Sequence, residues 1–309
     1  MPPAAAPDAT ILLATRDRAP RLRATLDLLA ALDVTGLSHE ILVVDNGSRD
    51  DTPAVLAEAA TRLPLTAFTE PSPGKNRALN RALPSARGAL LVFTDDDVEP
   101  ARGWLRALVE ASKRWPDAAI LGGPVEPRYP PGAPAWLVSH TFAAGAFAAH
   151  APQAHEGPCP RLPLGPNYAI RAAALAGRRF DDRVGSRGGA TDLMGGETEL
   201  LERLAREGAA SVHVPDAVVG HVVEPHQLEL PWLFRRAFRF GRTQARLHPD
   251  PARGGLGAVL AGAARYGWSC LRGPRARFRA GIRWYRARGE RYQRVASDAR
   301  PRRGAWLRP

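Results

Sequence analysis

A buried strand that runs into three acids constrains this chain more than any other feature. The apolar segment of residues 90–93 (Leu-Leu-Val-Phe) is followed, after one threonine, by residues 95–97 (Asp-Asp-Asp). Three neighbouring carboxylates repel one another unless a cation or several donors compensate. Because open α/β folds place ligands at the carboxyl ends of parallel strands, the segment predicts a metal site there. An acidic turn that caps a helix, with Pro100 just beyond, is the alternative.

Apolar strand patterns alternate with helical patterns through the first 121 residues. The predicted strands cover residues 10–15, 40–45, 65–69, 89–93 and 118–121, and the predicted helices cover residues 17–31, 52–62, 76–83 and 104–115. Strands that alternate with helices are typical of βαβ units and a parallel sheet. The sequence therefore predicts an α/β fold with a mostly parallel sheet flanked by helices.

The turns of this sheet exclude two nucleotide-binding motifs. Residues 15–18 (Thr-Arg-Asp-Arg), which follow the first strand, contain no glycine, so the dinucleotide fingerprint is absent, and the chain has no phosphate-binding P-loop. An acid at a strand end, such as Asp45, can still bind the ribose or base of a nucleotide. An Asx turn formed with Asn46 and Gly47 explains Asp45 equally well.

The segments beyond residue 121 are shorter and less regular. Residues 124–163 are rich in Pro, Ala and Gly, and their histidines share no helix face, so the sequence predicts a flexible loop there and no metal site. Further along, it predicts an ordered segment over 165–170, a glycine-rich mobile loop over 183–196, a helix from 197, short strands over 211–214 and 218–223, and an arginine-rich helix from 231.

Charge divides the chain into two predicted domains. Residues 1–225 hold 23 basic and 27 acidic residues, whereas residues 226–309 hold 20 basic and four acidic residues, a net charge of +16. We therefore expect a globular domain over 1–225 and a basic, Arg-rich helical extension over 226–309. Such an extension indicates an anionic membrane surface, nucleic acid or another polyanion as a partner.

Cysteine content and hydropathy indicate the compartment. The two cysteines, Cys159 and Cys270, are too few for a disulfide framework or a cysteine metal site. Residues 1–7 show no signal-peptide pattern. The longest weakly polar stretch, residues 254–271, contains Arg265 and five glycines and is a poor membrane span. We expect a cytoplasmic protein, with peripheral attachment to the inner face of the membrane as an option.

Taken together in chain order, these segments resemble the family-2 glycosyltransferases of the GT-A fold. The resemblance rests on residues 11–16, 43–48, 74–80, 93–97, 165–171 and 196–200, and on His221. It covers roughly residues 10–245, and its specificity lies in the order and spacing of the motifs. Members of the family transfer a sugar from a nucleotide diphosphate donor to a hydroxyl, usually with inversion of the anomeric centre.

The resemblance implies a set of donor-binding residues. Thr15, Arg16 and Asp45 would hold the nucleoside. The segment that begins with Gly74, Lys75 and Asn76 would lie near the base and the diphosphate. Asn167, in the ordered segment after the loop, joins the same set.

The acidic triplet matches the D-x-D motif of the family. The resemblance implies that Asp97 binds Mg²⁺ or Mn²⁺ directly, that Asp95 lies nearer the ribose or adds a second ligand, and that Asp96 fills the variable middle place. His221 matches a position that helps to hold metal or diphosphate, although a lone histidine in a strand is equally often structural. A metal held by one or two carboxylates and phosphate oxygens neutralises a diphosphate leaving group.

The catalytic base depends on one alignment. The family often shows two acids before a Thr-Glu-Leu helix start, and the second acid is the base. Here Thr198-Glu199-Leu200 puts Glu197 at the base position and Gly196 at the other acid's position. A shift of the alignment would make Glu199 the base instead. A carboxylate at a helix start can accept the acceptor's proton opposite the leaving group.

We therefore predict a metal-dependent inverting glycosyltransferase of the hexosyltransferase type. Its partners would be a nucleotide diphosphate sugar, an acceptor that is a glycan, a lipid-linked glycan or a small molecule, and an anionic membrane surface, with no nucleic acid. One alternative is a nucleotidyltransferase on a sugar phosphate, which would release pyrophosphate. The other is a non-catalytic polyanion-binding protein, in which the acids only form turns and the basic extension binds.

Overall fold

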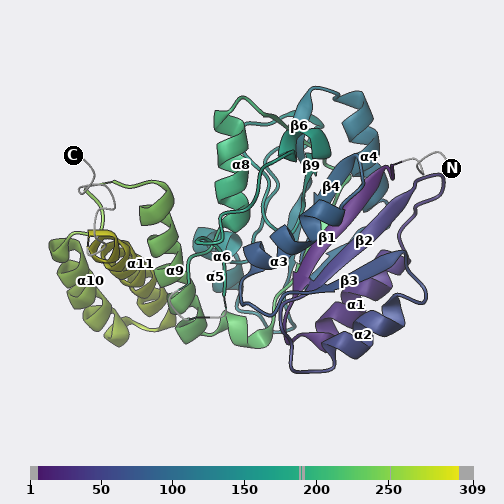
Figure 1. Ribbon diagram of the computed structural model, residues 1–309. Helices are drawn as coiled ribbons and strands as arrows, with labels where there is room; N and C mark the ends of the chain where they lie inside the picture. Colours follow the sequence, from purple (N-terminus) through teal and green to yellow (C-terminus); the bar gives the residue numbers. More distant parts are fainter. Residues whose placement is uncertain (1–5, 188, 190–191, 251, 299–309) are drawn as a thin grey trace, which may run out of the picture. The chain divides into compact units, whose positions relative to one another are not determined.

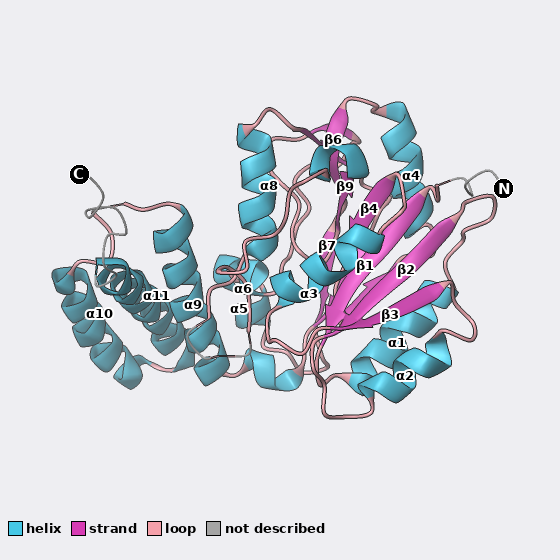
Figure 2. Ribbon diagram, viewed as in Figure 1, coloured by secondary structure: helices cyan, strands magenta, loops and turns pink. Residues whose placement is uncertain are grey.

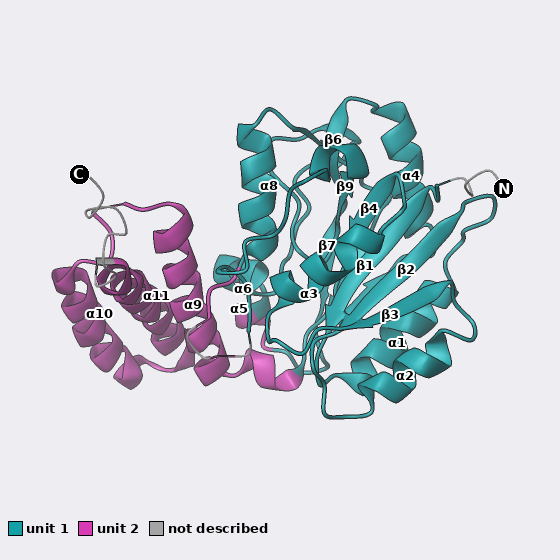
Figure 3. Ribbon diagram, viewed as in Figure 1, with its two compact units in different colours: residues 1–133, 138–188, 195–224 teal, residues 134–137, 189–194, 225–309 magenta. Residues whose placement is uncertain are grey.

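The computed structural model describes residues 6–187, 189, 192–250 and 252–298 (Figure 1). Two compact units make up the chain (Figure 3): unit 1 comprises residues 1–133, 138–188 and 195–224, and unit 2 comprises residues 134–137, 189–194 and 225–309. The two short early segments group with the C-terminal helices through direct contacts. The ring of Trp136 meets that of Phe278 edge to face at 5.5 Å, and Met194 donates its backbone N–H to Thr243 Oγ1 at 2.8 Å.

Eight strands form one sheet in the described part of unit 1, in the order β3-β2-β1-β4-β9-β6-β10-β8. Strands β3, β2, β1 and β4 are parallel neighbours (Figure 2), and β9 is antiparallel to both β4 and β6. The bounds are β1 Ala9–Thr15, β2 His39–Asp45, β3 Leu65–Thr69, β4 Leu90–Phe93, β6 Ala118–Gly122, β8 Gly157–Pro158, β9 Tyr168–Arg171 and β10 Ala210–His213. The predicted mostly parallel α/β sheet is thus confirmed.

Helices cover both faces of this sheet because alternate residues of each strand point to opposite sides. In β1, Ile11 and Leu13 belong to the core that α1, α2 and α4 cover, whereas Leu12 belongs to the core that α3 and α8 cover. These helices are α1 Ala19–Ala30, α2 Thr52–Ala59, α3 Lys75–Ala82, α4 Trp104–Arg114 and α8 Gly196–Arg206, with a short α7 at Ala172–Leu175 and a 3-10 turn at Leu83–Ser85. Both faces of the sheet are therefore buried.

A second sheet, of three strands, follows directly from the acidic triplet. It consists of β5 Val98–Pro100, β11 Val219–Val222 and β7 Val125–Arg128, with β11 in the middle. In the antiparallel register of β5 and β11, His221 lies opposite Val98. The backbone N–H of Val222 donates to the carbonyl of Asp97 at 3.0 Å. This pairing brings residues that are more than 120 positions apart to one place.

Residues 124–163 are more regular than a flexible loop, so that prediction was wrong. Besides β7 and β8, they contain α5 Ala135–Val138 and α6 Thr141–Ala146. Leu137, Ala143 and Phe147 from this segment are buried. Small residues between them allow close packing, so burial orders a segment whose composition favours loops. The predicted mobile loop over 183–196 is irregular in its described part up to residue 195, and Gly196 already belongs to α8. Residues 188, 190 and 191 lie outside the described residues.

Three helices form the body of unit 2: α9 Leu230–Leu247, α10 Leu256–Ser269 and α11 Pro274–Asp298, with 3-10 turns at Pro225–Leu228 and Cys270–Arg272. Helix α11 packs along α9 at places where only glycine fits. A Cβ on Gly241 would come 2.1 Å from the carbonyl oxygen of Arg286, and one on Gly289 would come 1.9 Å from that of Phe238. None of the described helices is long and apolar enough to cross a membrane.

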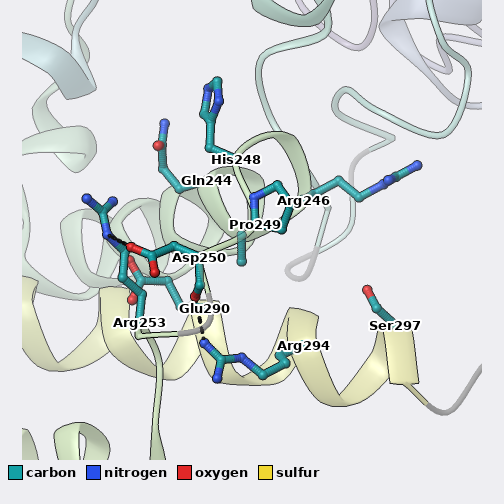
Figure 4. A pocket seen from close by; sticks show the side chains of 10 residues that line it. Gln244, Arg246, His248, Pro249, Asp250, Arg253, Glu290, Arg294 and Ser297 are labelled. Atoms are coloured by element: carbon teal, nitrogen blue, oxygen red, sulfur yellow. Dashed lines mark hydrogen bonds and ion pairs between the residues drawn. The ribbon is translucent and has the colours of Figure 1, made fainter.

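Unit 2 also contains a pocket of about 480 Å³ at the carboxyl ends of α9 and α11 (Figure 4). Arginines and acids share its wall. Arg253 pairs with Asp250 at 3.1 Å, and Arg294 donates to the backbone carbonyl of Asp250 at 3.0 Å. Glu290, which is buried, pairs with Arg286 at 3.3 Å. Since both of its acids are already paired with arginines, we assign no ligand to this pocket.

Candidate active site

Polar side chains gather where the parallel strands end. Thr15 and Asp45, the last residues of β1 and β2, are partners in the strand register. Thr15 donates its hydroxyl to Asp96 Oδ2 at 2.7 Å, and both side chains are buried. The acids after β4 therefore lie at the carboxyl edge of the parallel strands, where the sequence placed the site.

Two cations compensate the three acids. Arg18 donates from one nitrogen, Nη1, to Asp96 Oδ1 at 3.0 Å and to Asp97 Oδ2 at 2.6 Å. Lys75 Nζ forms an ion pair with Asp95. Lys75 was predicted to belong to the site, but Arg18 was not. The arginine lies in a turn that the sequence marked only as lacking glycine, and its pairing with acids some 80 residues away leaves no local pattern.

The acids differ in their proton affinity. Burial raises the pKa of Asp96 to about 6, with a further contribution from the charge of Asp97, while Arg18 opposes the shift. Burial also disfavours the charge of Asp95, but the ammonium of Lys75 outweighs it and lowers the pKa of Asp95. The pKa of Lys75 is raised against burial by Asp95 and then by Glu197. Asp95 and Lys75 therefore form a charged pair at neutral pH.

The second sheet brings His221 against Asp97. Their Nε2 and Oδ1 atoms are 3.5 Å apart, and His221 Nδ1 is 2.9 Å from the backbone carbonyl of Phe147. Because a carbonyl only accepts, Nδ1 carries the hydrogen. In the neutral ring, Nε2 then turns its lone pair toward a carboxylate oxygen, which favours a cation between them. Metal-binding histidines commonly donate their other N–H to a carbonyl in this way.

This donor set fits a divalent metal that also uses ligands from a substrate. Within the described residues, no three His, Cys, Asp or Glu side chains gather closely enough to hold an ion by themselves. Mg²⁺ is usually held by one or two carboxylates together with phosphate oxygens and water. Asp97 and His221 would supply the protein ligands here. Both carboxylates already pair with a cation, Asp97 with Arg18 and Asp95 with Lys75. Only Asp97 also faces a histidine nitrogen, so we leave Asp95 out of the metal set.

The two glutamates at the start of α8 have different surroundings. Glu199 accepts from Arg203 Nε at 3.0 Å, one helical turn along. Glu197 has no hydrogen bond or ion pair to any residue that the structure describes. A Cβ on Gly165 would lie 3.2 Å from Glu197 Oε1, and the charge of Glu197 raises the pKa of Lys75. Glu197 therefore lies near the acidic cluster, and its carboxylate forms no ion pair within the described part of the chain.

Asn76 fixes the start of α8. Its Nδ2 donates to the carbonyls of Asp181 and Val184, at 2.9 Å in each case. Its amide leaves no space for a side chain on Gly196, where a Cβ would come 2.1 Å from Asn76 Oδ1. The residue that precedes Glu197 must therefore be small, which explains why a glycine stands where the family often has an acid. Asn76 thus fills the space beside Gly196 and bonds to the loop that precedes α8.

Gly196→Ala should loosen the start of α8 and displace Glu197. The added methyl group cannot be accommodated without movement of Asn76 or the helix, and overpacking of this kind costs typically about 1–3 kcal/mol. We expect a lower urea midpoint for unfolding. The double variant Gly196→Ala/Asn76→Ala should recover part of the loss, because the clashing amide is gone. A single variant as stable as the parent protein would contradict this contact.

The remaining predicted donor residues lie around the same edge. Asp45 Oδ1 accepts from the backbone N–H of Ser48, three residues on, at 2.8 Å, so its carboxylate holds the turn through Asn46 and Gly47. Arg16 is partly exposed, and its Nε lies 3.5 Å from Asp17. Gly74, with φ at +144°, precedes α3 and donates its backbone N–H to Asn46 Oδ1 at 2.7 Å. Asn46, predicted only as a turn residue, thereby holds the segment that carries Lys75.

Asn167 lies in the core below the site. Its Oδ1 accepts from Trp104 Nε1 at 2.8 Å, and its Nδ2 donates to the carbonyls of Pro124 and Ala217, at 2.9 Å and 2.6 Å. The side chain is completely buried. These bonds join α4 to the segments that lead into β7 and β11. We therefore leave the Asn167 side chain out of the proposed donor contacts.

Comparison with known proteins assigns the family. Residues 10–146 match the model of glycosyl transferase family 2. Over 242 residues the chain is 31% identical to the succinoglycan biosynthesis protein ExoM of Rhizobium meliloti. This alignment covers 77% of this chain and 74% of ExoM. The chain belongs to glycosyltransferase family 2. The glycosyltransferase AglE of Haloferax volcanii is 29% identical over 130 residues, 41% of this chain and 42% of AglE.

Solved structures show the same fold for this family 2 glycosyltransferase. The mannosyltransferase PcManGT from Pyrobaculum calidifontis, in complex with GDP-Man and Mn²⁺, has a TM-score of 0.62 at 21% identity and covers 95% of this chain and 89% of its own. Residues 1–349 of TarS from S. aureus have a TM-score of 0.53 at 16% identity, and the match covers 94% of this chain and 92% of the TarS chain. The fold is of the GT-A type, and the chain is a glycosyltransferase that uses a nucleotide sugar, so the predicted family and enzyme class are confirmed.

Proposed function

We propose that this glycosyltransferase moves a sugar, with inversion of the anomeric centre, from a nucleotide diphosphate to an acceptor hydroxyl in a reaction that depends on Mg²⁺ or Mn²⁺. The observation that carries the proposal is the way the acids divide. Asp95 pairs with Lys75, and Asp96 is held by Thr15 and Arg18. Asp97 pairs with Arg18 and also faces a histidine nitrogen, and Glu197 has no hydrogen bond or ion pair among the described side chains.

Asp97 and His221 would hold the metal, which supplies positive charge to the diphosphate leaving group. Arg18 and Lys75 add permanent positive charges at the same strand ends. A bound diphosphate therefore meets cations on the protein itself. The Mn²⁺ in the PcManGT complex supports this assignment.

Glu197 would accept the proton of the acceptor hydroxyl. A general base needs a carboxylate that is not already neutralised by an arginine or a lysine. Glu197 meets this condition, whereas Glu199 is paired with Arg203. An inverting transfer needs no covalent nucleophile, because the acceptor oxygen displaces the nucleoside diphosphate directly.

For the acceptor, we propose only its chemical class. The name of the relative ExoM, a succinoglycan biosynthesis protein, favours a glycan or a lipid-linked glycan over a small molecule. The identities of the donor's sugar and of its nucleotide are to be determined first. GDP-Man in PcManGT and UDP in a TarS complex make guanosine and uridine diphosphate sugars the first donors to test.

A thermal-shift panel of nucleotide sugars tests the proposal. A ligand that binds only the folded protein stabilises it by about 2.7 kcal/mol at 100 times its Kd. We expect the melting temperature to rise with one class of nucleotide sugar when Mn²⁺ is present, and to rise less after chelation. Equal stabilisation with and without metal, across every donor that binds, would contradict the metal dependence.

A further inference from the structure

One side of helix α10 presents apolar residues to solvent. The side chains of Leu256, Leu260 and Trp268 are 52%, 60% and 60% exposed, and Leu271, in the turn that follows, is 83% exposed. Steps of three, four or eight residues place these side chains along one helix face. We call Leu256, Leu260, Trp268 and Leu271 the apolar stripe.

The opposite side of α10 is already occupied within unit 2. Tyr266 stacks on Trp284 of α11, with ring centroids 5.0 Å apart, and meets Phe234 of α9 edge to face at 5.7 Å. A Cβ on Gly262 would lie 3.0 Å from Trp284 Cδ1, so the helix and α11 are in close contact. The apolar stripe is thus a second apolar face, which the described part of unit 2 does not bury. Apolar residues on such an exposed face mark an interaction site.

The charged residues of α10 and of the greater part of α11 are of one sign. Residues 254–289 contain eight arginines and no Asp or Glu. Arg265 and Arg272 are exposed beside the stripe, and the guanidinium of Arg272 lies 5.0 Å from the centre of the Trp268 ring. A helix with an apolar face, an aromatic residue and flanking arginines has the composition of a helix that lies in the membrane interface.

We propose that the apolar stripe of α10 is a docking surface for an anionic lipid bilayer. Its leucines and Trp268 enter the boundary between headgroups and acyl chains, and Arg265 and Arg272 contact lipid phosphates. This goes beyond the reaction proposed above and does not depend on it. It also adds hydrophobic insertion at named residues to the electrostatic attraction expected of the basic extension.

The same features disfavour two other occupants. In a two-fold dimer, the apolar stripe of one copy would lie against the apolar stripe of the other. The arginines beside the two stripes would then face one another and repel. Nucleic acid would neutralise the arginines but would leave the exposed leucines without an apolar partner. A lipid bilayer with anionic headgroups satisfies both the leucines and the arginines.

Vesicle flotation of the full chain tests the docking surface. We expect the protein to float with vesicles that contain phosphatidylglycerol and to bind phosphatidylcholine vesicles more weakly. In Leu260→Glu/Leu271→Glu, partition onto anionic vesicles should fall by at least about tenfold, because two apolar side chains no longer enter the lipid. The control is Leu28→Glu on α1 of unit 1, where one exposed leucine receives a single negative charge; its partition should equal that of the parent protein, whereas Leu260→Glu and Leu271→Glu, each tested alone, should both lower it.

Salt separates insertion from simple charge attraction. At about 1 M salt the screening length is roughly 3 Å, so attraction between exposed charges is largely lost. We expect a fraction of the parent protein to stay on the vesicles under these conditions. Complete release by salt would overturn insertion. Arg265→Ser/Arg272→Ser should reduce the preference for anionic over neutral vesicles; an unchanged preference would overturn the role of these two arginines.

The exposed Cys270 gives a direct readout. It lies between Trp268 and Leu271, whereas Cys159 is buried. An environment-sensitive dye on Cys270 should shift its emission to the blue when anionic vesicles are added, and no shift would contradict insertion at this place. Vesicle binding unaffected by Leu260→Glu/Leu271→Glu would overturn the proposal. The proposal would also be overturned if the parent protein left vesicles unbound but formed a dimer, or bound duplex DNA, and the double variant abolished that association. Donor-induced thermal stabilisation should stay unchanged in all these variants, which keeps this test separate from that of the reaction.

Discussion

Asp97→Asn is expected to abolish metal-dependent donor binding while the fold stays intact. The change removes the negative charge that faces His221, so the pair loses its attraction for a divalent cation. It also relieves repulsion within the acidic triplet, which offsets the loss of the charged contact with Arg18, so the free energy of unfolding should change little. Calorimetric titration of the donor, with and without Mn²⁺, should show the metal enhancement of affinity reduced by roughly 100-fold or more, since loss of groups that merely support metal ligands already costs 10–100-fold.

Asp96→Asn is the matched control for this prediction. It makes the same chemical change one residue earlier, at a carboxyl whose pKa burial raises to about 6 and which Thr15 and Arg18 already hold. A neutral amide should be tolerated there, and the response to Mn²⁺ should survive. Asp97→Asn with the same Mn²⁺-dependent affinity as the parent protein would count against the metal site.

Glu197→Gln is expected to lower turnover by roughly 100-fold or more, the low end for a positioned general base. Glutamine keeps the size of the side chain and removes its ability to accept a proton. Donor affinity should change little, because Glu197 has no bond to the described residues that surround the donor site. Steady-state turnover and donor titration on the same preparation separate the two effects.

Glu199→Gln serves as the comparison. Glu199 lies two positions further along the helix and is paired with Arg203. Its loss should mainly weaken that pair, with a milder effect on turnover. An active Glu197→Gln beside an inactive Glu199→Gln would show that Glu199 is the base. If both variants stay active, the proposed proton transfer fails for this chain.

Local signals made the first half of the sheet predictable. The apolar runs of β1, β2 and β3 end within one residue of their predicted bounds, because each is followed by polar or turn residues. Thr52 and Pro53 likewise mark the start of α2. The position of the acids at the sheet edge followed from the parallel arrangement alone.

Long-range contacts explain what the sequence did not reveal. Strand β5 has only three residues, and it forms because β11 pairs with it from far along the chain. The bonds of Arg18 to the acids, and the fit of Asn76 against Gly196, depend equally on distant segments. The exposed stripe of α10 was unpredictable for the same reason: the apolar pattern of a helix does not reveal how much of it another element covers.

The configuration of the product is the sharpest test of an inverting, metal-dependent sugar transfer. With a donor of known anomeric configuration and a suitable acceptor, proton NMR of the product distinguishes inversion from retention. We expect that only the inverted product forms, together with free nucleoside diphosphate, and that chelation of the metal stops the reaction. A product of retained configuration, or full activity after chelation, would contradict it.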